Sequence, residues 1–368
     1  MANTNPLAAM KIKKLIGFKQ ITPGVITGDL ITALKQCGID AVTGYNNHSA
    51  VISVGQMSVL GSTFYGLKFS TAKGSNNGLF TITLVNDADK LKEHPVQAGF
   101  RLTQSATGTK AINAEMLAIY NNSSISLTPK ITTNTEETSV YYEFVFSAVK
   151  DSYGNYKVVV DVYVNKQKFS TGSSSLFSGR NIFINFGSTI TVDVDAGFSY
   201  MVGDMYVAEL DYNSDGTVTP QLLGNLTLEP FTVASYAGDK HTNTKNQDIV
   251  TALNTLDPNN DLGVLAIKPV EQAASVTFNV PDIAGKSIYG AALNIVYKDS
   301  IAPNNRLSYQ ITEGTTQLPE ETITERNADV AGFTTVSKIL TVPATGGDWN
   351  AENLRFKLDM FNRGTDAE

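Results

Sequence analysis

The chain is poor in residues that mark secreted or membrane-spanning proteins. It has one cysteine, Cys37, among 368 residues, so no disulfide can form within it, and this favours folding in a reducing compartment. We interpret Cys37 as a small buried apolar residue. No run of about 20 apolar residues occurs, and residues 1–18 lack the apolar core of a signal peptide. The sequence therefore predicts no membrane partner.

Charge is also scarce. Charged residues make up 17% of the chain, below the usual fraction of about a quarter, and the net charge is −7 with a pI near 5.1. A nucleic-acid-binding protein normally carries a basic stripe, so this composition argues against nucleic acid as a partner. We interpret the small basic cluster at Lys11, Lys13, Lys14 and Lys19 as part of a solvated arm.

Motifs that carry catalysis are missing as well. The three histidines, His48, His94 and His241, do not stand at metal-ligand spacing from cysteine, acidic residues or one another, so no zinc site is predicted. The sequence contains no G-x-S-x-G elbow, no P-loop and no G-x-G-x-x-G motif. We therefore expect a protein that is not an enzyme, with no catalytic residue and no cofactor.

What the chain does contain is a succession of segments with period-two alternation. Between 156 and 164, the four valines at even positions share one face, with Asp161 and Tyr163 opposite, which predicts a half-buried strand. Asn165 and Lys166 predict the turn that follows it. Similar alternation predicts strands at 64–69, 80–84, 142–148, 182–186, 190–194 and 203–211. We interpret 64–69 and 80–84 as a hairpin through a turn at 74–78.

Helix signals are few. Three short segments carry them: Thr27–Gly38, 246–256, and a turn at Asp348–Asn353. Downstream of residue 270, further strands are predicted at 274–280, 288–297, 306–313, 334–342 and 354–361, enough for a second, smaller β-sandwich. The expected fold class is all-β with few short helices.

Two phrases carry a family resemblance. GDMYVAELD at 203–211 and LLGNLTLEP at 222–230 resemble the late strands of a concanavalin A-like (laminin G-like) jelly roll, and together they resemble virion structural proteins of tailed bacteriophages. The phrases IYGAALNIVYKDS, NRLSYQITEG and LTVPATGGDWNAENLRFKLDMFNRG resemble the C-terminal module of the same proteins. The resemblance implies a particle component assembled in the bacterial cytoplasm, whose partners are other virion proteins and symmetric copies of itself.

The expected domain organisation combines the pattern with this resemblance. It has an N-terminal arm at 1–13, a concanavalin A-like jelly roll at 14–230, a polar linker at 231–247 and a C-terminal β-sandwich at 248–364. The resemblance does not distinguish a head, collar, tail or fibre component.

A weak metal-binding motif begins at Asp211, where the phrase at 203–211 ends. Asp211, Asn213 and Asp215 match the start of a calcium loop, D-x-N-x-D-G. The twelfth position, which should be glutamate, is Leu222. We interpret the segment as an Asn/Asp/Gly turn, with a loose Ca²⁺ site as the alternative.

Two rival functions involve glycans. Some concanavalin-like hydrolases carry Glu-x-Asp-x-x-Glu, and here Glu209 and Asp211 are followed by Ser214, which cannot protonate a leaving group. A hydrolase is therefore the weakest hypothesis. A carbohydrate-binding adhesin module that contacts host glycans is the stronger alternative, with candidate aromatic residues at Tyr45, Tyr65, Tyr153 and Tyr212. We interpret the single tryptophan, Trp349, as a core residue of the C-terminal module.

Overall fold

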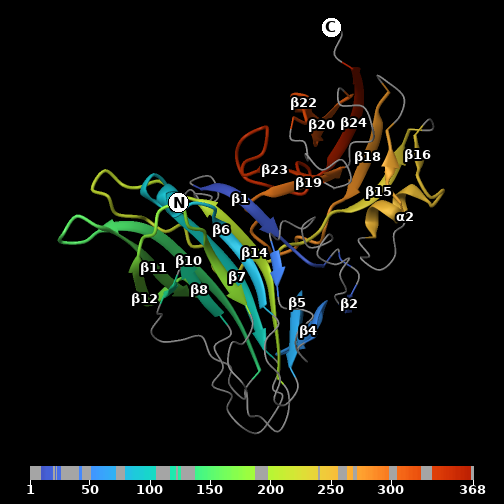
Figure 1. The fold of residues 1–368 in the computed structure, drawn as a ribbon. Helices are drawn as coiled ribbons and strands as arrows, with labels where there is room; N and C mark the ends of the chain where they lie inside the picture. Colours follow the sequence, from blue (N-terminus) through green and yellow to red (C-terminus); the bar gives the residue numbers. More distant parts are fainter. Residues whose placement is uncertain are drawn as a thin grey trace. The chain divides into compact units, whose positions relative to one another are not determined.

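The computed structural model confirms the predicted fold class: the regular secondary structure of the described residues is almost all β-strand (Figure 1). Among the described residues, helix is limited to the 3-10 turn η2 (Ala88–Lys92) and the helix α2 (Ile249–Asn254). The structure describes residues 10–19, 21, 23–25, 41–43, 51–71, 79–104, 117–121, 123–125, 137–186, 198–238, 241–255, 263–267, 272–297, 305–324 and 334–365. The predicted helix Thr27–Gly38, the turn at 74–78, the strand at 190–194, Cys37, Tyr45 and His48 lie outside these residues.

The chain divides into two compact units. The large unit comprises Ala9–Lys19 and Pro23–Leu228, and the small unit comprises Glu229–Glu368 with two short N-terminal stretches, Met1–Ala8 and Gln20–Thr22. The division between Leu228 and Glu229 falls within two residues of the expected end of the first domain.

Two antiparallel sheets form the large unit. One has nine strands in the order β12-β11-β10-β7-β14-β5-β4-β2, with β1 paired beside β14, and the other has five in the order β3-β6-β13-β8-β9. The strands are β1 (Lys11–Ile16), β2 (Gly24–Val25), β3 (Ala41–Thr43), β4 (Val51–Val59), β5 (Ser62–Thr71), β6 (Leu79–Val85), β7 (Val96–Gln104), β8 (Leu117–Asn121), β9 (Ser123–Ile125), β10 (Thr138–Lys150), β11 (Tyr156–Val164), β12 (Gln167–Ser175), β13 (Ile182–Phe186) and β14 (Phe198–Glu209).

The core of the large unit lies between these two sheets. Phe100 of β7 stacks on Phe144 of β10, with ring centroids 5.4 Å apart. It also meets Phe186 of the five-stranded sheet edge-on at 4.8 Å. The inward valines of β11, at 158, 160 and 162, are at most 1% exposed and pair with Ala148, Phe146 and Phe144. The alternation in the sequence therefore identifies the buried face correctly.

Local turn chemistry is confirmed at both ends of β11. Asn165 and Lys166 both have positive φ, at 48° and 69°, as a two-residue hairpin turn requires. Asp151 caps the preceding turn, because its Oδ1 accepts the backbone N–H groups of Tyr153 and Asn155.

The predicted hairpin between 64–69 and 80–84 is wrong. The strand β5 pairs with β4 and β14 in the nine-stranded sheet, whereas β6 pairs with β3 and β13 in the other. Alternation within each segment shows which residues are buried, but it does not show which sheet a strand joins. These two consecutive strands therefore lie in different layers of the sandwich.

The small unit has a six-stranded sheet in the order β15-β18-β24-β20-β21, with β22 beside β20, and two separate pairs, β16-β17 and β19-β23. Its strands are β15 (Thr232–Ala237), β16 (Thr242–Asn243), β17 (Leu265–Ala266), β18 (Ala274–Asn279), β19 (Ala291–Tyr297), β20 (Asn305–Glu313), β21 (Thr316–Gln317), β22 (Glu321–Thr322), β23 (Thr334–Leu340) and β24 (Phe356–Thr365). The five strands predicted in this part of the chain are therefore all present.

Two expected boundaries need correction. The stretch 231–247, predicted to be a linker, contains β15 and β16, and β15 pairs with β18 across five residues. Its polar composition reflects an exposed edge strand rather than a spacer, because β15 lies at the end of its sheet. The last residues of the predicted arm, from Lys11, form β1 and pair with β14.

The β11 register gives a matched pair of substitutions. Val162→Asp places a carboxylate in the core without a partner, so we expect a loss of several kcal/mol and insoluble protein. Val159→Asp changes the opposite, half-buried face and should leave soluble protein. Soluble yield and urea unfolding measure both. Tolerance of Val162→Asp with loss of Val159→Asp would show that the register is shifted by one residue.

Candidate functional site

The outer face of the nine-stranded sheet carries a buried polar cluster. Glu143 of β10 and Tyr206 of β14 both pair with Gly99 of β7, so their side chains share the face opposite Phe100. Gln97 and Arg101, two residues to either side of Gly99, point the same way. All four side chains are almost completely buried, although this face lies outside the sandwich core.

The segment Gln221–Leu228, here called the strap, covers this cluster. The strap contains residues 222–228 (LLGNLTL) of the phrase at 222–230, yet none of its residues belongs to a strand. Four side chains of the sheet hold the strap, and we call them the clamp: Gln97, Arg101, Glu143 and Asp204.

Glu143 binds the middle of the strap. Its Oε1 accepts the backbone N–H of Leu223 at 2.8 Å and the Tyr206 hydroxyl proton at 2.6 Å. Its Oε2 accepts the N–H of Gly224 at 3.0 Å. Gly224 has a φ of +75°, a left-handed backbone conformation that favours glycine.

Gln97 and Arg101 hold the two ends. The Gln97 amide donates to the carbonyl of Gln221 and accepts its N–H, both at 3.0 Å. The Arg101 guanidinium donates to Oδ1 of Asn225 and to the carbonyl of Leu226, both at 2.6 Å. Gln97 therefore binds Gln221 through two hydrogen bonds, and Arg101 binds Asn225 and Leu226 through two more.

Asp204 completes the clamp from an unusual backbone position. It lies in an irregularity of β14 with φ +47°, a left-handed conformation that costs free energy for a residue with a Cβ. Its Oδ2 accepts from Nε of Arg101 at 2.9 Å, and its Oδ1 accepts the N–H of Leu228 at 3.0 Å. Its carbonyl accepts the Tyr141 hydroxyl proton at 2.9 Å.

Electrostatics in the cluster follow from burial. Burial raises the pKa of the Glu143 carboxyl above its ordinary value, against the opposing effect of the Tyr206 and backbone hydrogen bonds. Burial, with the nearby Glu143 charge, also raises the pKa of Tyr206 well above the ordinary value. These groups have the chemistry of an acid–base site, but their polar atoms bind the chain itself. In this arrangement the cluster positions the strap.

The motif residues predicted for calcium lie in a turn. Asp215 Oδ1 accepts the N–H and the hydroxyl proton of Thr217, and the Asn213 amide donates to the Thr217 hydroxyl. Asp211 faces His94 Nδ1 at 3.3 Å instead. Within the part of the chain that the structure describes, no group of three His, Cys, Asp or Glu side chains could hold a metal ion.

The hydrolase motif is not assembled either. Glu209 forms ion pairs with Lys11 at 3.4 Å and Lys13 at 2.9 Å, which lower the pKa of its carboxyl below the ordinary value against the effect of burial. The side chain of Asp211 is 91% exposed. A carboxylate already paired with two lysines and an exposed one do not form a general acid and a nucleophile.

The candidate aromatic residues have separate roles. The Tyr212 hydroxyl donates to the carbonyl of Leu91 and accepts the N–H of Ala148, so this ring is structural. Tyr65 lies under the amine of Lys19, 5.7 Å from its ring centroid. Tyr153 is 88% exposed, at the tip of the β10–β11 hairpin. Trp349 is 8% exposed and packs with Ala291 and Leu354, which confirms it as a core residue.

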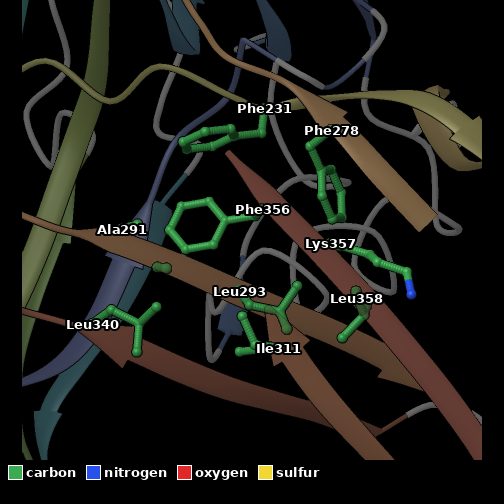
Figure 2. A pocket seen from close by; sticks show the side chains of 10 residues that line it. Phe231, Phe278, Ala291, Leu293, Ile311, Leu340, Phe356, Lys357 and Leu358 are labelled. Carbon is green, nitrogen blue, oxygen red and sulfur yellow. The ribbon is translucent and has the colours of Figure 1, made fainter. Parts of the chain in front are cut away.

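A second candidate site is an apolar pocket in the small unit (Figure 2). It offers about 50 Å³ of free space between β19 and β23 on one side and β18, β20 and β24 on the other. Phe231 and Phe356 meet edge-on at its mouth with ring centroids 5.4 Å apart, while the Lys357 amine points away from the rings. Because the lining offers almost no polar group, the pocket has no means of orienting a polar ligand.

Sequence reasoning missed the clamp. The signal was present in β7, where Gln97, Arg101 and Thr103 stand on one face of the strand and alternate with the apolar residues of the other face. Every residue of that strand is buried, so both faces are covered. The partners of Gln97 and Arg101 in the strap lie more than 120 residues away, and no local pattern indicates them.

Comparisons with known proteins were made at three levels. No protein-family model matches the chain, and no curated protein matches it. Among solved structures, the alginate lyase Aly36B aligns over 54% of this chain and 97% of its own, with 9% identity and a TM-score of 0.37. The CBM22-1-CBM22-2 tandem domain of Paenibacillus barcinonensis Xyn10C covers 96% and 90%, with 10% identity and a TM-score of 0.25.

A botulinum neurotoxin type G receptor-binding domain aligns over 82% of this chain and 77% of its own, with 11% identity and a TM-score of 0.21. None of these named structures is a virion protein. At such identities and TM-scores, the likenesses assign neither a family nor a ligand to this chain. In the described residues, no helix is long and apolar enough to cross a membrane.

Glu143→Gln tests the centre of the clamp. The new amide nitrogen would face the N–H of Gly224, so we expect a loss of about 1–3 kcal/mol in the free energy of unfolding at pH 7. Because the folded-state pKa of Glu143 is raised, its contribution is fully present below the unfolded pKa and decreases as pH rises through the folded pKa. The stability gap between wild type and variant should therefore narrow from acid to neutral pH. A gap independent of pH would contradict this assignment.

Chelation tests the turn at 211–216. A site occupied at 100 times its dissociation constant would contribute about 2.7 kcal/mol of stability. We expect EGTA to leave the melting temperature unchanged, because Asn213 and Asp215 already bind their own loop. A reproducible fall of several degrees, reversed by Ca²⁺, would establish the alternative.

Proposed function

We propose that this chain is a non-catalytic structural protein that acts through surface contacts, as a component of a bacteriophage virion. The observation that carries the proposal is the strap. Among the side chains best suited to chemistry in the described residues, Glu143 and Arg101 bind the backbone of the strap, and the Tyr206 hydroxyl donates to Glu143. A polar cluster whose side chains are occupied by the chain itself has a structural role.

The sequence resemblance supports the finer part of the proposal. Two of the phrases that resemble tailed-phage virion proteins meet here: the phrase at 203–211 lies mostly in β14 and supplies Asp204, and the phrase at 222–230 contains most of the strap, whose Leu228 N–H binds Asp204. These two phrases therefore belong to one physical unit. Low charge and a surface rich in Ser, Thr and Asn suit a protein that packs against neighbours in a particle.

Glycan binding is the second candidate, and Tyr153 is the observation that favours it. Its ring is 88% exposed on a turn that Asp151 fixes, and an exposed, fixed aromatic ring can stack on a sugar. An alginate lyase Aly36B mutant has been solved in complex with an alginate trisaccharide, but its TM-score of 0.37 to this chain adds no support. An adhesin on a virus particle would combine both roles.

A mass-spectrometric inventory of washed virions, separated into heads and tails, tests the structural role. We expect the chain in one fraction at a fixed, symmetric copy number. Detection only in infected-cell lysate would contradict the virion role.

A glycan array tests the second candidate, with Tyr153→Ala as the matched variant. Because Tyr153 is exposed, this substitution should not change the melting temperature. Binding by wild type that is lost in the variant would establish a glycan site at this turn. Equal binding by both proteins, or no binding, would remove Tyr153 from consideration.

A further inference from the structure

The side chains of the clamp bind mainly the backbone groups of the strap. Gln97 binds the N–H and C=O of Gln221, Glu143 binds the N–H groups of Leu223 and Gly224, and Asp204 binds the N–H of Leu228. Asn225 and Thr227 add side-chain contacts, both to Arg101. The clamp therefore has the features of a docking site for an extended segment, filled by a segment of the same chain.

The leucines of the strap are buried to different extents. Leu223 is the one leucine of the strap that is fully buried, at 3% exposed, whereas Leu222, Leu226 and Leu228 are half-buried. The strap also has no place in a β-ladder. Water replaces most of the hydrogen bonds that opening breaks, and it resolvates the Glu143 carboxyl and the Arg101 guanidinium. The strap can therefore open without unfolding the sandwich.

The flanks of the strap also permit exchange. On the N-terminal side, the exposed residues 213–217 form a turn that is anchored only at Tyr212 and at its bridge to Val218. On the C-terminal side, the strap ends at Leu228, where the large unit ends. No residue of the strap pairs in a ladder, so its exchange breaks no strand pairing of the large unit.

We propose that the clamp is an exchange site, which takes the strap of a second copy of this chain in place of its own. The clamp–strap contacts are identical whether the strap binds its own chain or a second copy. The equilibrium between these two forms therefore depends on the turn at 213–217 and on the local concentration of the chain. Among closely spaced copies the exchanged form is favoured. The proposal rests on the assembly role above, for which it names the partner.

Complementation between two disabled copies tests the exchange. Glu143→Ala disables the clamp and leaves the strap intact. Gly224→Val disables the strap, because the φ of Gly224 is positive, and leaves the clamp intact. Each variant alone should be monomeric. Refolded together and analysed by native mass spectrometry, they should form a heterodimer that contains one intact clamp–strap pair. Two monomer populations in the mixture would overturn the proposal.

A synthetic peptide of residues 219–230 provides a second readout. Added to the Gly224→Val protein, it should raise the melting temperature in a concentration-dependent way, and a peptide with Leu223→Asp should not. Leu223→Asp in the whole chain replaces Gly224→Val if that variant does not fold. Peptide binding without heterodimer formation would also overturn the exchange, because the clamp would then serve its own chain alone. Neither result depends on whether virions contain the chain.

Discussion

The buried ion pair between Arg101 and Asp204 is the interaction on which the outer face depends. Asp204 occupies a left-handed backbone position that its side chain and carbonyl contacts stabilise. Arg101 is 4% exposed, and its guanidinium lies 4.9 Å from the Phe64 ring centroid and 5.7 Å from that of Tyr141. Removal of one charge would leave the other buried without an opposite charge, which typically costs about 3–5 kcal/mol. The pair therefore fixes both the irregularity in β14 and the end of the strap.

The rest of the site follows from that anchor. Arg101 and Asp204 hold the strap from Asn225 to Leu228, and Glu143 and Gln97 hold it from Gln221 to Gly224. The two halves meet over Gly99, where a Cβ would lie 2.3 Å from the Tyr206 ring. The absence of a side chain there lets Tyr206 lie across the sheet and reach Glu143. The large unit thus ends in a segment fixed by polar contacts, directly before the small unit begins.

Much of the fold could be predicted from local pattern, because period-two alternation reports burial directly. The valines of β11, the turn at Asn165 and Lys166, and the strands of the small unit all follow from it. Sheet membership could not be predicted, since β5 and β6 follow one another in sequence but lie in different sheets. The clamp could not be predicted for a related reason. Glutamine, arginine and glutamate within strands indicate a solvated face, and only the distant strap makes that face buried.

Hydrogen exchange at single strap amides tests the central claim, that polar side chains of the sheet fix residues 221–228 outside any ladder. The account predicts protection at Leu223, Gly224 and Leu228, whose N–H groups bind Glu143 and Asp204. That protection should be weaker than in β7 and β10, because the strap can open while the sandwich stays folded. Exchange at those three amides as fast as in an unstructured peptide would contradict the account.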